Sequence, residues 1–256
     1  RGGSSDQNLI LLDEAPIYNP SHLVGLFSVF NSDAIKNVRV TKNNIPTEYR
    51  GRLSSVVDIR MKEGNNKEYK FSAGVELIMT RLRVEGPFAK RKGSFMIAGR
   101  RTYHDLWIHP LTENDFRLWF YDLNIKGNYK IDEKNRLFVS GYLGDDVFRI
   151  RDDFKIIWGN KTGTLRWNHL FNEKLFSNTT LTYSNYSFLN RTYAEYEDEE
   201  SDFNFGYLSF GSDLTDWTAK TDFDFIPSYK HHVKFGMHNR RCPRRLKPPL
   251  RILQPG

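Results

Sequence analysis

Hydrophobic and polar residues alternate along most of this chain, from Tyr69 to about His238. The segment WFYDLNIKGNYKI shows the pattern clearly, with apolar odd positions from Trp119 to Ile131 and polar even positions from Asp122 to Lys130. Successive side chains of a strand point to opposite faces, so each such segment predicts a strand with one apolar and one polar face. DWTAKTDFDFI and HHVKFGMH repeat the pattern. We count about nine such strands.

Two architectures use strands of this kind. A soluble sandwich or small barrel turns the apolar face inward, whereas a transmembrane barrel turns it outward to lipid and tolerates polar side chains in its lumen. Alternation alone leaves both open. The first corresponds to a soluble β-rich binding protein with an N-terminal α/β module, and the second to an outer-membrane barrel.

The lengths of the connections favour the membrane barrel. Tight turns are predicted at 89–93, 132–135, 171–174 and 227–230, and long polar connections at 103–117, 146–160 and 187–203. Short and long connections alternate, as they do when tight turns lie on one side of a membrane and loops on the other. Expected strands of about 10 to 14 residues fit a tilted bilayer crossing better than a globular sheet.

The first 65 residues form a different kind of segment. NLILL and NVRVTK predict strands, as does Val56–Met61, and a short helix is expected around Leu23–Phe30 or Asp33–Lys36. We therefore predict a small α/β unit over 1–65, joined to the strand-rich segment 66–238 by the polar stretch KEGNNKEY.

The net charge of +7 comes almost entirely from the C-terminal segment 239–256. Six basic residues and no acidic residue lie there, and without them the chain carries a net charge of +1. The charge therefore does not indicate a nucleic-acid-binding face. The segment also holds four prolines, which are incompatible with a central strand. We expect this tail to lie outside the barrel, as a frameshifted or artificial end or as a disordered tail.

Catalytic and metal-binding signatures are absent from the sequence. We find no supported Ser-His-Asp order, no glycine-rich phosphate loop and no metal-ligand spacing, and the one cysteine, Cys242, cannot form a disulfide within the chain. His231 and His232 are adjacent in a predicted strand and point to opposite faces, so they cannot chelate one ion. The prediction is a non-enzyme without cofactor or metal.

The N-terminal stretch QNLILLDEAPIYNPSHLVGLFSVFNSDAIKNVRVTKNNIPTEYRGRLSSVVDIRMKEG resembles the second half of the plug domain of TonB-dependent outer-membrane receptors, in particular those of the Bacteroidetes. TRLRVEGPFAKRKGSFMIAGRRTY is similar to the first barrel hairpins of the same group. The resemblance extends to about His238. The implied fold is mostly β, with a partial plug followed by about nine antiparallel strands of an incomplete transmembrane β-barrel.

The resemblance also implies a function. Such receptors take up a siderophore, vitamin, glycan or peptide through a barrel of about 22 strands with a plugged lumen. It implies residence in the outer membrane of a Gram-negative bacterium. The implied partners are the TonB energy-coupling complex, outer-membrane lipid, a small ligand or nutrient and a surface lipoprotein. On this interpretation a signal peptide, the TonB box and the first half of the plug precede Arg1, and further strands follow.

Three positions depart from the plug pattern. Asp13-Glu14 replaces Asp-Gly, Asn43-Asn44 replaces Gly-Gly, and Tyr49-Arg50-Gly51-Arg52 replaces Tyr-Gly-Gly-Arg. Glycine is the residue that most easily adopts positive φ, so Glu14 and Arg50 stand where a turn would favour glycine.

Charged residues are the candidates for contacts between plug and barrel lumen, although solvated charge is the alternative for each. The plug candidates are Arg1, Asp13, Arg39, Glu48, Arg52 and Asp58, and the barrel candidates are Glu85, Arg100 and Arg101. Surface ion pairs contribute only about 0–1 kcal/mol each, so such contacts could break under force.

The segment SFLNRTYAEYEDEESDFNFGY is a candidate ligand loop. Its aromatic and acidic residues could hold a cationic or sugar ligand, and the candidates are Tyr193, Tyr196, Glu197 and Asp198. An acidic run is more commonly a solvated loop. His104 and Asp105 are interpreted as part of an ordinary polar loop.

Overall fold

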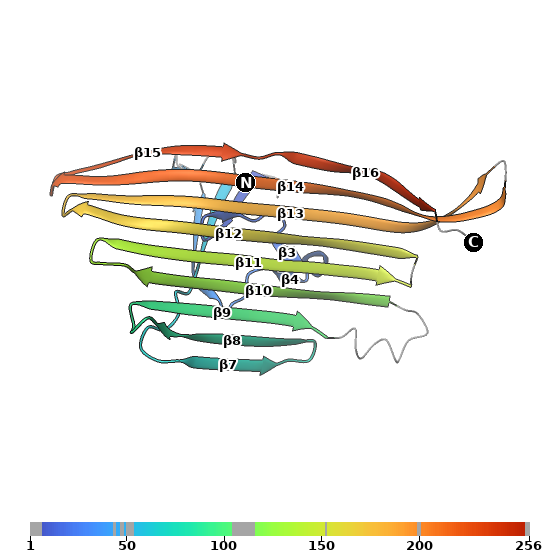
Figure 1. Cartoon of the computed structure of the whole chain (residues 1–256), viewed down its shortest axis with the longest axis horizontal. Helices are drawn as coiled ribbons and strands as arrows, with labels where there is room; N and C mark the ends of the chain where they lie inside the picture. Colours follow the sequence, from blue (N-terminus) through green and yellow to red (C-terminus); the bar gives the residue numbers. More distant parts are fainter. Residues whose placement is uncertain are drawn as a thin grey trace.

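The computed structural model describes residues 7–42, 45, 46, 49, 54–103, 116–151, 153–198 and 201–253. They form a ten-stranded antiparallel sheet and, against one of its faces, a smaller N-terminal unit (Figure 1). Strands account for 76% of the chain and helix for 2%, which confirms the predicted mostly-β class.

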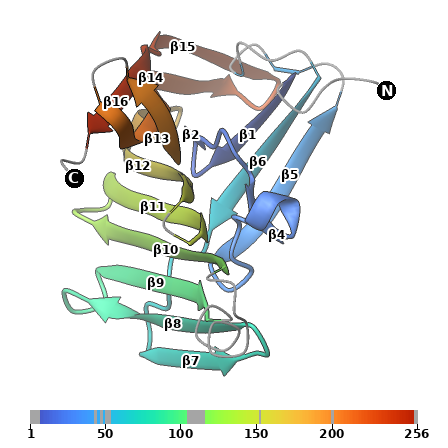
Figure 2. The same ribbon diagram turned by 90° about the vertical axis from the view of Figure 1, so that its right-hand side faces the viewer.

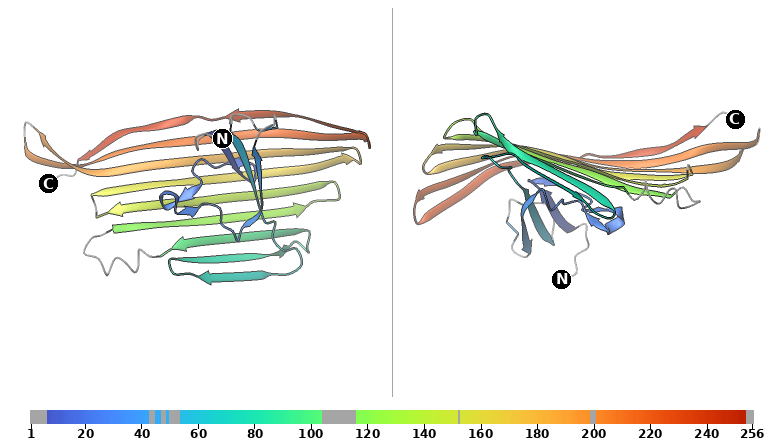
Figure 3. Two further views of the ribbon diagram at one scale, coloured as in Figure 1. Left: turned by 180° about the vertical axis from the view of Figure 1, so that it is seen from behind. Right: turned by 90° about the horizontal axis from the view of Figure 1, so that it is seen from below.

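From β7 to β15 the large sheet is a meander in which each strand pairs with its neighbours in sequence, and its tenth strand, β16, pairs with β14. Its strands are β7 (Lys70–Val75), β8 (Met79–Phe88), β9 (Gly93–Thr102), β10 (Phe116–Lys130), β11 (Asn135–Ile150), β12 (Phe154–Asn172), β13 (Leu175–Asp198), β14 (Ser201–Ser228), β15 (His231–Arg241) and β16 (Arg244–Leu253). β7–β15 are the nine strands expected from the alternation. The sheet is curved, and the N-terminal unit lies on its concave side (Figures 2 and 3).

The four tight turns lie at one end of this sheet, as predicted. At the other end, only the connection between β9 and β10 is long. The long connections expected at 146–160 and 187–203 are wrong, because β11 and β12 stay paired up to Ile150 and Phe154, and β13 and β14 up to Asp198 and Ser201. Antiparallel pairing needs only backbone groups, so the strands continue beyond the point where side-chain alternation fades.

The C-terminal segment was expected outside the barrel, and it pairs with β14 instead. β15 pairs with β14 up to Trp217 and Arg241, and β16 resumes in the same register at Leu214 and Arg244. The Thr215 amide donates to the Pro243 carbonyl at 3.2 Å, which bridges the interruption. Proline is tolerated on an edge strand because its missing N–H faces away from the neighbour.

The N-terminal unit is built on the sheet β2-β1-β6-β5. Its strands are β1 (Asn8–Leu12), β2 (Ala15–Pro16), β5 (Ile35–Lys42) and β6 (Ser55–Met61), and β3 (Ser21–His22) pairs with β4 (Phe27–Ser28). The predicted strands are present, but the predicted helix is reduced to one 3₁₀ turn, η2, at Leu23–Gly25. Leu23 and Val24 have positive φ values of 49° and 57°, which an α-helix cannot accommodate.

The two faces of the large sheet differ as the alternation predicts. Below the N-terminal unit, even-numbered side chains of β10–β14 are buried and polar, including Asp122, Asn124, Lys126, Asn160, Thr180 and Asp216. Odd-numbered side chains on the opposite face are exposed and apolar, including Ile125, Val139, Leu165, Leu181 and Trp217. The apolar side chains therefore do not converge on a sealed interior.

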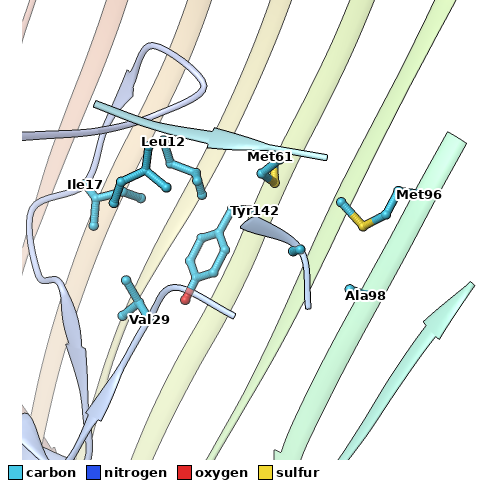
Figure 4. Close-up of a cluster of buried hydrophobic side chains, with 9 residues drawn as sticks. Leu12, Ile17, Val29, Met61, Met96, Ala98 and Tyr142 are labelled. Atoms are coloured by element: carbon cyan, nitrogen blue, oxygen red, sulfur yellow. The ribbon is translucent and has the colours of Figure 1, made fainter. Parts of the chain in front are cut away.

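A hydrophobic core joins the unit to the sheet. Figure 4 shows Leu12, Ile17, Val29 and Met61 of the unit together with side chains of β9 and β11, namely Met96, Ala98 and Tyr142. Because both parts contribute, the unit is fixed to the polar face by a small apolar centre within a largely polar surround. Within the described residues, no helix has the length and apolar character needed to cross a bilayer.

Candidate functional site

The interface between the N-terminal unit and the large sheet is the candidate site, and its centre is the turn that joins β1 to β2. Asp13 and Glu14 both have positive φ, 45° and 76°. A non-glycine residue in the left-handed region costs roughly 1–2 kcal/mol. Within the unit, the turn is held by hydrogen bonds from the Asp13 amide to the Ile59 carbonyl at 2.8 Å and from the Met61 amide to Asp13 Oδ1 at 3.2 Å.

Glu14 is the acceptor for three cations. Arg60 Nη1 of β6 lies 2.9 Å from Oε1, Arg166 Nη1 of β12 lies 3.2 Å from Oε1, and Lys220 Nζ of β14 lies 2.7 Å from Oε2. Burial acts to raise the pKa of Glu14, but Lys220 and Arg60 outweigh it and lower the pKa to about 2. The side chain is therefore a buried carboxylate that two strands of the large sheet and one of the unit neutralise.

Asp13 forms a second buried ion pair beside the first. Lys126 Nζ of β10 lies 3.0 Å from Asp13 Oδ1 and also donates to the Met61 carbonyl at 3.0 Å. Thr164 Oγ1 of β12 donates to the Asp13 carbonyl at 2.9 Å. Side chains of β10, β12 and β14 thus converge on the two residues of a single turn.

His22 connects the unit to β10 and β11. Its Nδ1 lies 2.7 Å from Asp146 Oδ2, its Nε2 lies 3.4 Å from Asp122 Oδ2, and the Tyr142 hydroxyl is 3.2 Å from Nε2. The ring stacks on Phe120 at a centroid distance of 4.2 Å. Burial acts to lower the pKa of His22, but hydrogen bonds and charge from Asp122 and Asp146 raise it, so the site favours the imidazolium ion.

A third contact group surrounds Tyr18. Its hydroxyl donates to Asp216 Oδ2 of β14 at 2.7 Å, and Arg240 Nε of β15 donates to the same oxygen at 2.7 Å. Asn160 of β12 accepts from the Tyr18 and Asn19 amides at 3.3 Å and donates to the Asn19 carbonyl at 2.7 Å. The side-chain amide of Asn160 in the large sheet therefore hydrogen-bonds the backbone of the unit.

The end of the interface nearer the tight turns depends on backbone contacts. The Glu63 carbonyl accepts from Ser94 Oγ at 2.7 Å and from Asn128 Nδ2 at 3.1 Å. Arg136 Nη2 lies 3.5 Å from the Glu63 carboxylate. The contacts therefore extend along the length of the unit, and no single group carries the whole attachment.

The structure brings together some of the predicted contact residues. Asp13 meets Lys126, and Arg100 donates both to Asp122 and to the Ser28 carbonyl of the unit. Asp58 pairs with Arg60 inside the unit at 3.1 Å. The remaining predicted residue of the unit within the described part, Arg39, is exposed on β5.

Of the other predicted residues, one lies on the opposite face, one beside the interface and the rest outside the described residues. Arg101 is on the opposite face of the sheet, over the Trp119 ring at 5.3 Å. Glu85 is buried on the face that carries the unit, opposite Met96, and lies 4.0 Å from Arg83, which donates to the Asp33 carbonyl of the unit. Outside the described residues are Arg1, Glu48, Arg52, His104 and Asp105.

The predicted ligand loop is largely strand in the structure. Tyr193 lies in β13 opposite Tyr207, and the backbone at Tyr196, Glu197 and Asp198 continues that strand. The side chains of these last three lie outside the described residues. The ligand-loop assignment therefore stays a prediction.

Sequence reasoning missed most of the interface. The sequence marks Glu14 only as a departure from glycine and does not distinguish its partners Arg166 and Lys220 from other polar residues. The other omitted residues are Tyr18, His22, Asp122, Lys126, Asp146, Asn160 and Asp216. A signal was present, because all of these sheet residues occupy even positions on the polar face.

A cleft of about 440 Å³ lies between β1 and β6 of the unit and β13–β15 of the sheet. Glu14, Arg60 and Lys220 line it together with Arg39 and Asp222. Its walls carry both signs of charge. In the part of the chain that the structure describes, no group of three His, Cys, Asp or Glu side chains is placed to hold a metal.

The arrangement of the large sheet and the N-terminal unit is similar to that in solved structures of other proteins. The chain is similar to the ferric preacinetobactin receptor BauA from Acinetobacter baumannii, with a TM-score of 0.57, 12% identity, and coverage of 87% of this chain and 36% of that one. It is also similar to the G324V mutant of the ferric enterobactin receptor PfeA from Pseudomonas aeruginosa, with a TM-score of 0.50, 11% identity, and coverage of 94% and 51%. The chain therefore shares the fold of part of these receptors.

The domain organisation expected from the sequence assigns the N-terminal unit to the plug and the large sheet to the barrel wall. The chain spans about a third to a half of the length of these receptors. No protein-family model and no curated protein sequence matches the chain. We use plug and barrel wall for the two parts below.

Proposed function

We propose that this chain is part of an energy-coupled outer-membrane receptor that imports a ligand through a plugged barrel. The observation that carries the proposal is the contrast between the two faces of the wall. The polar face holds the plug through buried ion pairs such as Asp13–Lys126, whereas the opposite face exposes Val139 and Leu165 as lipid would require.

The attachment of the plug suits a part that must move. A wide barrel leaves a lumen that leaks unless something fills it. The apolar centre is small, and much of the remaining contact is polar, so water entering between the parts can replace the broken hydrogen bonds. Force applied to the plug from the periplasm, by TonB through a segment upstream of Arg1, would then open a path along the cleft.

The function needs no catalytic step. Ligand would be captured at the end of the barrel where β11–β12 and β13–β14 extend, and release would follow displacement of the plug. We propose the ligand class on the basis of the sequence resemblance, and it includes a siderophore, vitamin, glycan or peptide. The Bacteroidetes type of receptor is proposed on the same basis. The neighbouring receptors are named for ferric siderophores, which makes an iron complex the first ligand to test.

The test uses the full-length protein expressed in its native cells. We expect it in the outer-membrane fraction, with an electrophoretic mobility that changes on heating, as folded barrels show. Uptake of the transported ligand should stop when the energy-coupling protein is deleted. Recovery in the soluble fraction would instead support a soluble binding protein, and uptake that persists without energy coupling would indicate a passive channel.

A further inference from the structure

Lys220 stands between two carboxylates that belong to different parts of the protein. Its Nζ lies 2.7 Å from Glu14 Oε2 of the plug and 3.4 Å from Asp222 Oδ2 of the barrel wall. Lys220 and Asp222 are two residues apart in β14, so both side chains lie on the polar face of the sheet. One ammonium group therefore has an anionic partner within reach whether or not the plug is in place.

The cleft gives this lysine room to change partner. Glu14, Lys220 and Asp222 all line the cleft of about 440 Å³. The side chains of Lys220 and Asp222 are 21% and 35% exposed, whereas Glu14 is only 5% exposed. Lysine carries its charge on a flexible four-carbon stem. A move of the ammonium group from the buried carboxylate to the more exposed one needs rotation of that stem and no movement of the strand.

The other two cations around Glu14 also have partners within their own part of the protein. Arg60 of the plug lies 3.1 Å from Asp58 Oδ2 of the same strand. The guanidinium group of Arg166 in the wall lies 4.3 Å from the centre of the Phe138 ring, directly across the pair of strands β11 and β12 (Figure 1). A cation at that distance is attracted to the ring face. Separation of the two parts thus leaves neither arginine without a partner.

Lys126 lacks such an alternative. Its Nζ is held at 3.0 Å by Asp13 Oδ1 and at 3.0 Å by the Met61 carbonyl, and both groups belong to the plug. Among the described residues, it forms no ion pair with a carboxylate of the wall. Departure of the plug would leave this ammonium group without an anion. The two lysines of the wall therefore differ, because Lys126 opposes separation and Lys220 can accommodate it.

We propose that Lys220 exchanges Glu14 for Asp222 when the plug leaves the barrel wall, and that Asp222 thereby favours plug release. The proposal rests on the receptor function proposed above, in which the plug moves. A charge that loses its partner in a poorly hydrated site raises the free energy of the separated state. Asp222 lowers that cost, and in the docked state it competes with Glu14 for the same ammonium group. Both effects act in the direction of release.

The test follows plug separation by hydrogen exchange in the full-length protein, purified in a neutral detergent. The segment 18–23 of the plug is the probe. The Tyr18 amide donates to Asn160 Oδ1 of the wall at 3.3 Å, and the Leu23 amide donates to Asp146 Oδ1 of the wall at 2.7 Å. These amides become free to exchange when the plug separates from the wall. Their exchange rate therefore reports release at a place remote from the substituted residue.

The two partners of Lys220 should have opposite effects on this rate. We expect exchange in Asp222→Asn to be about two- to fivefold slower than in the native protein, the size of effect that a partly exposed ion pair can have. Glu14→Gln should exchange at least about tenfold faster, because the buried contact that holds the plug is lost. A purely structural role of Asp222 would instead make its removal speed the exchange.

Asp224 of β14 is the matched control, on the same face of the same strand. Its Oδ1 lies 2.6 Å from His232 Nε2 and 3.5 Å from Lys234 Nζ, and both partners belong to β15 of the wall. Asp224→Asn should therefore change the exchange rate by less than about twofold. If Asp222→Asn does not fold, Asp222→Ser also lacks the carboxylate and gives the same comparison.

A double-mutant cycle shows whether Asp222 acts through the lysine. In a Lys220→Met background, Asp222→Asn should have no further effect on exchange, because no ammonium group remains to be shared. The proposal is overturned if Asp222→Asn exchanges as fast as Asp224→Asn or faster. It is also overturned if the slowing by Asp222→Asn persists in the Lys220→Met background.

Failure of this inference can be distinguished from failure of the proposed function. Energy-coupled uptake by an outer-membrane protein whose exchange rate is unchanged in Asp222→Asn removes the role of Asp222 and leaves the receptor assignment intact. Recovery of the protein in the soluble fraction removes the receptor assignment, and with it the plug release that Asp222 would favour.

Discussion

Glu14 of the plug and Lys220 of the barrel wall form an ion pair of 2.7 Å across more than 200 residues of sequence. The pair forms at a turn where Glu14 has a φ of 76° and where glycine would be the easier residue. Two opposing effects therefore meet at one position. The backbone favours glycine, and the three cations around the carboxylate favour glutamate.

Replacement of Glu14 by glycine shows which effect dominates. Relief of the positive φ is worth roughly 1–2 kcal/mol. Loss of the carboxylate leaves Arg60, Arg166 and Lys220 without their shared anion, and breaking a buried pair by removing one partner costs roughly 3–5 kcal/mol. We therefore expect Glu14→Gly to lower the free energy of unfolding of the purified protein in urea by a net of about 1–4 kcal/mol.

The control for this measurement is Glu133→Gln, in an ion pair whose carboxylate is 89% exposed. That change should alter the free energy of unfolding by less than about 1 kcal/mol. An increase in stability for Glu14→Gly would mean that the cations find other partners and that the turn is only a backbone feature.

Protonation of Glu14 at low pH should weaken the same ion pair. The folded-state pKa of about 2 is below the ordinary value of 4.5, so the stabilisation is fully present above pH 4.5 and decreases as the pH falls towards 2. Glu14→Gln should therefore flatten the dependence of unfolding on pH between about 2 and 4.5. If the loss of stability at low pH were the same in Glu14→Gln as in the native protein, other carboxylates would be its cause.

His22 gives the interface a pH dependence of the opposite sign. Its pKa is raised in the folded protein, because Asp122 and Asp146 favour the imidazolium ion. Its contribution is thus fully present below the unfolded value of about 6.5 and is lost as the pH rises through the folded pKa. The other groups around it are Tyr142 and, through Asp122, Arg100.

The measurement is the protection of the His22 segment from hydrogen exchange between pH 6 and 9, corrected for the intrinsic exchange rate. We expect protection to decrease with rising pH in the native protein and to be low and less pH-dependent in His22→Gln. His231→Gln, at an exposed position of β15, serves as the matched control and should behave like the native protein. A pH profile in His22→Gln identical to the native one would exclude this histidine as the cause.

The Asp13–Lys126 pair offers a double-mutant cycle. Both side chains are nearly inaccessible, with exposures of 5% and 4%. Lys126→Met leaves Asp13 buried without its cation and should lower the free energy of unfolding by roughly 3–5 kcal/mol. Asp13→Asn/Lys126→Met should recover a substantial part of that loss, because neither charge remains. Strict additivity of the two single changes would show that the residues do not interact.

The sequence predicted the strands of this protein better than its contacts. Alternation is a local property, so the nine strands from β7 to β15 could be identified from the order of residues such as Leu123, Asn124 and Ile125. The partners of Glu14 come from β6, β12 and β14, and only the three-dimensional register brings them to one point. The positive φ at Leu23, which replaces the predicted helix, likewise accompanies a distant contact, from its amide to Asp146 at 2.7 Å.

The last prediction tests which solvent the outward face meets, and it uses two valines of nearly equal exposure. Val139 of the barrel wall is 55% exposed on the face away from the plug, and Val40 of the plug is 52% exposed on β5. If the outward face meets lipid, Val139→Lys should cost up to roughly 2–4 kcal/mol in a bilayer. Val40→Lys should cost much less, because a plug surface meets water. Unfolding in lipid vesicles measures both, and similar small costs for the two variants would place Val139 in water and contradict a transmembrane wall.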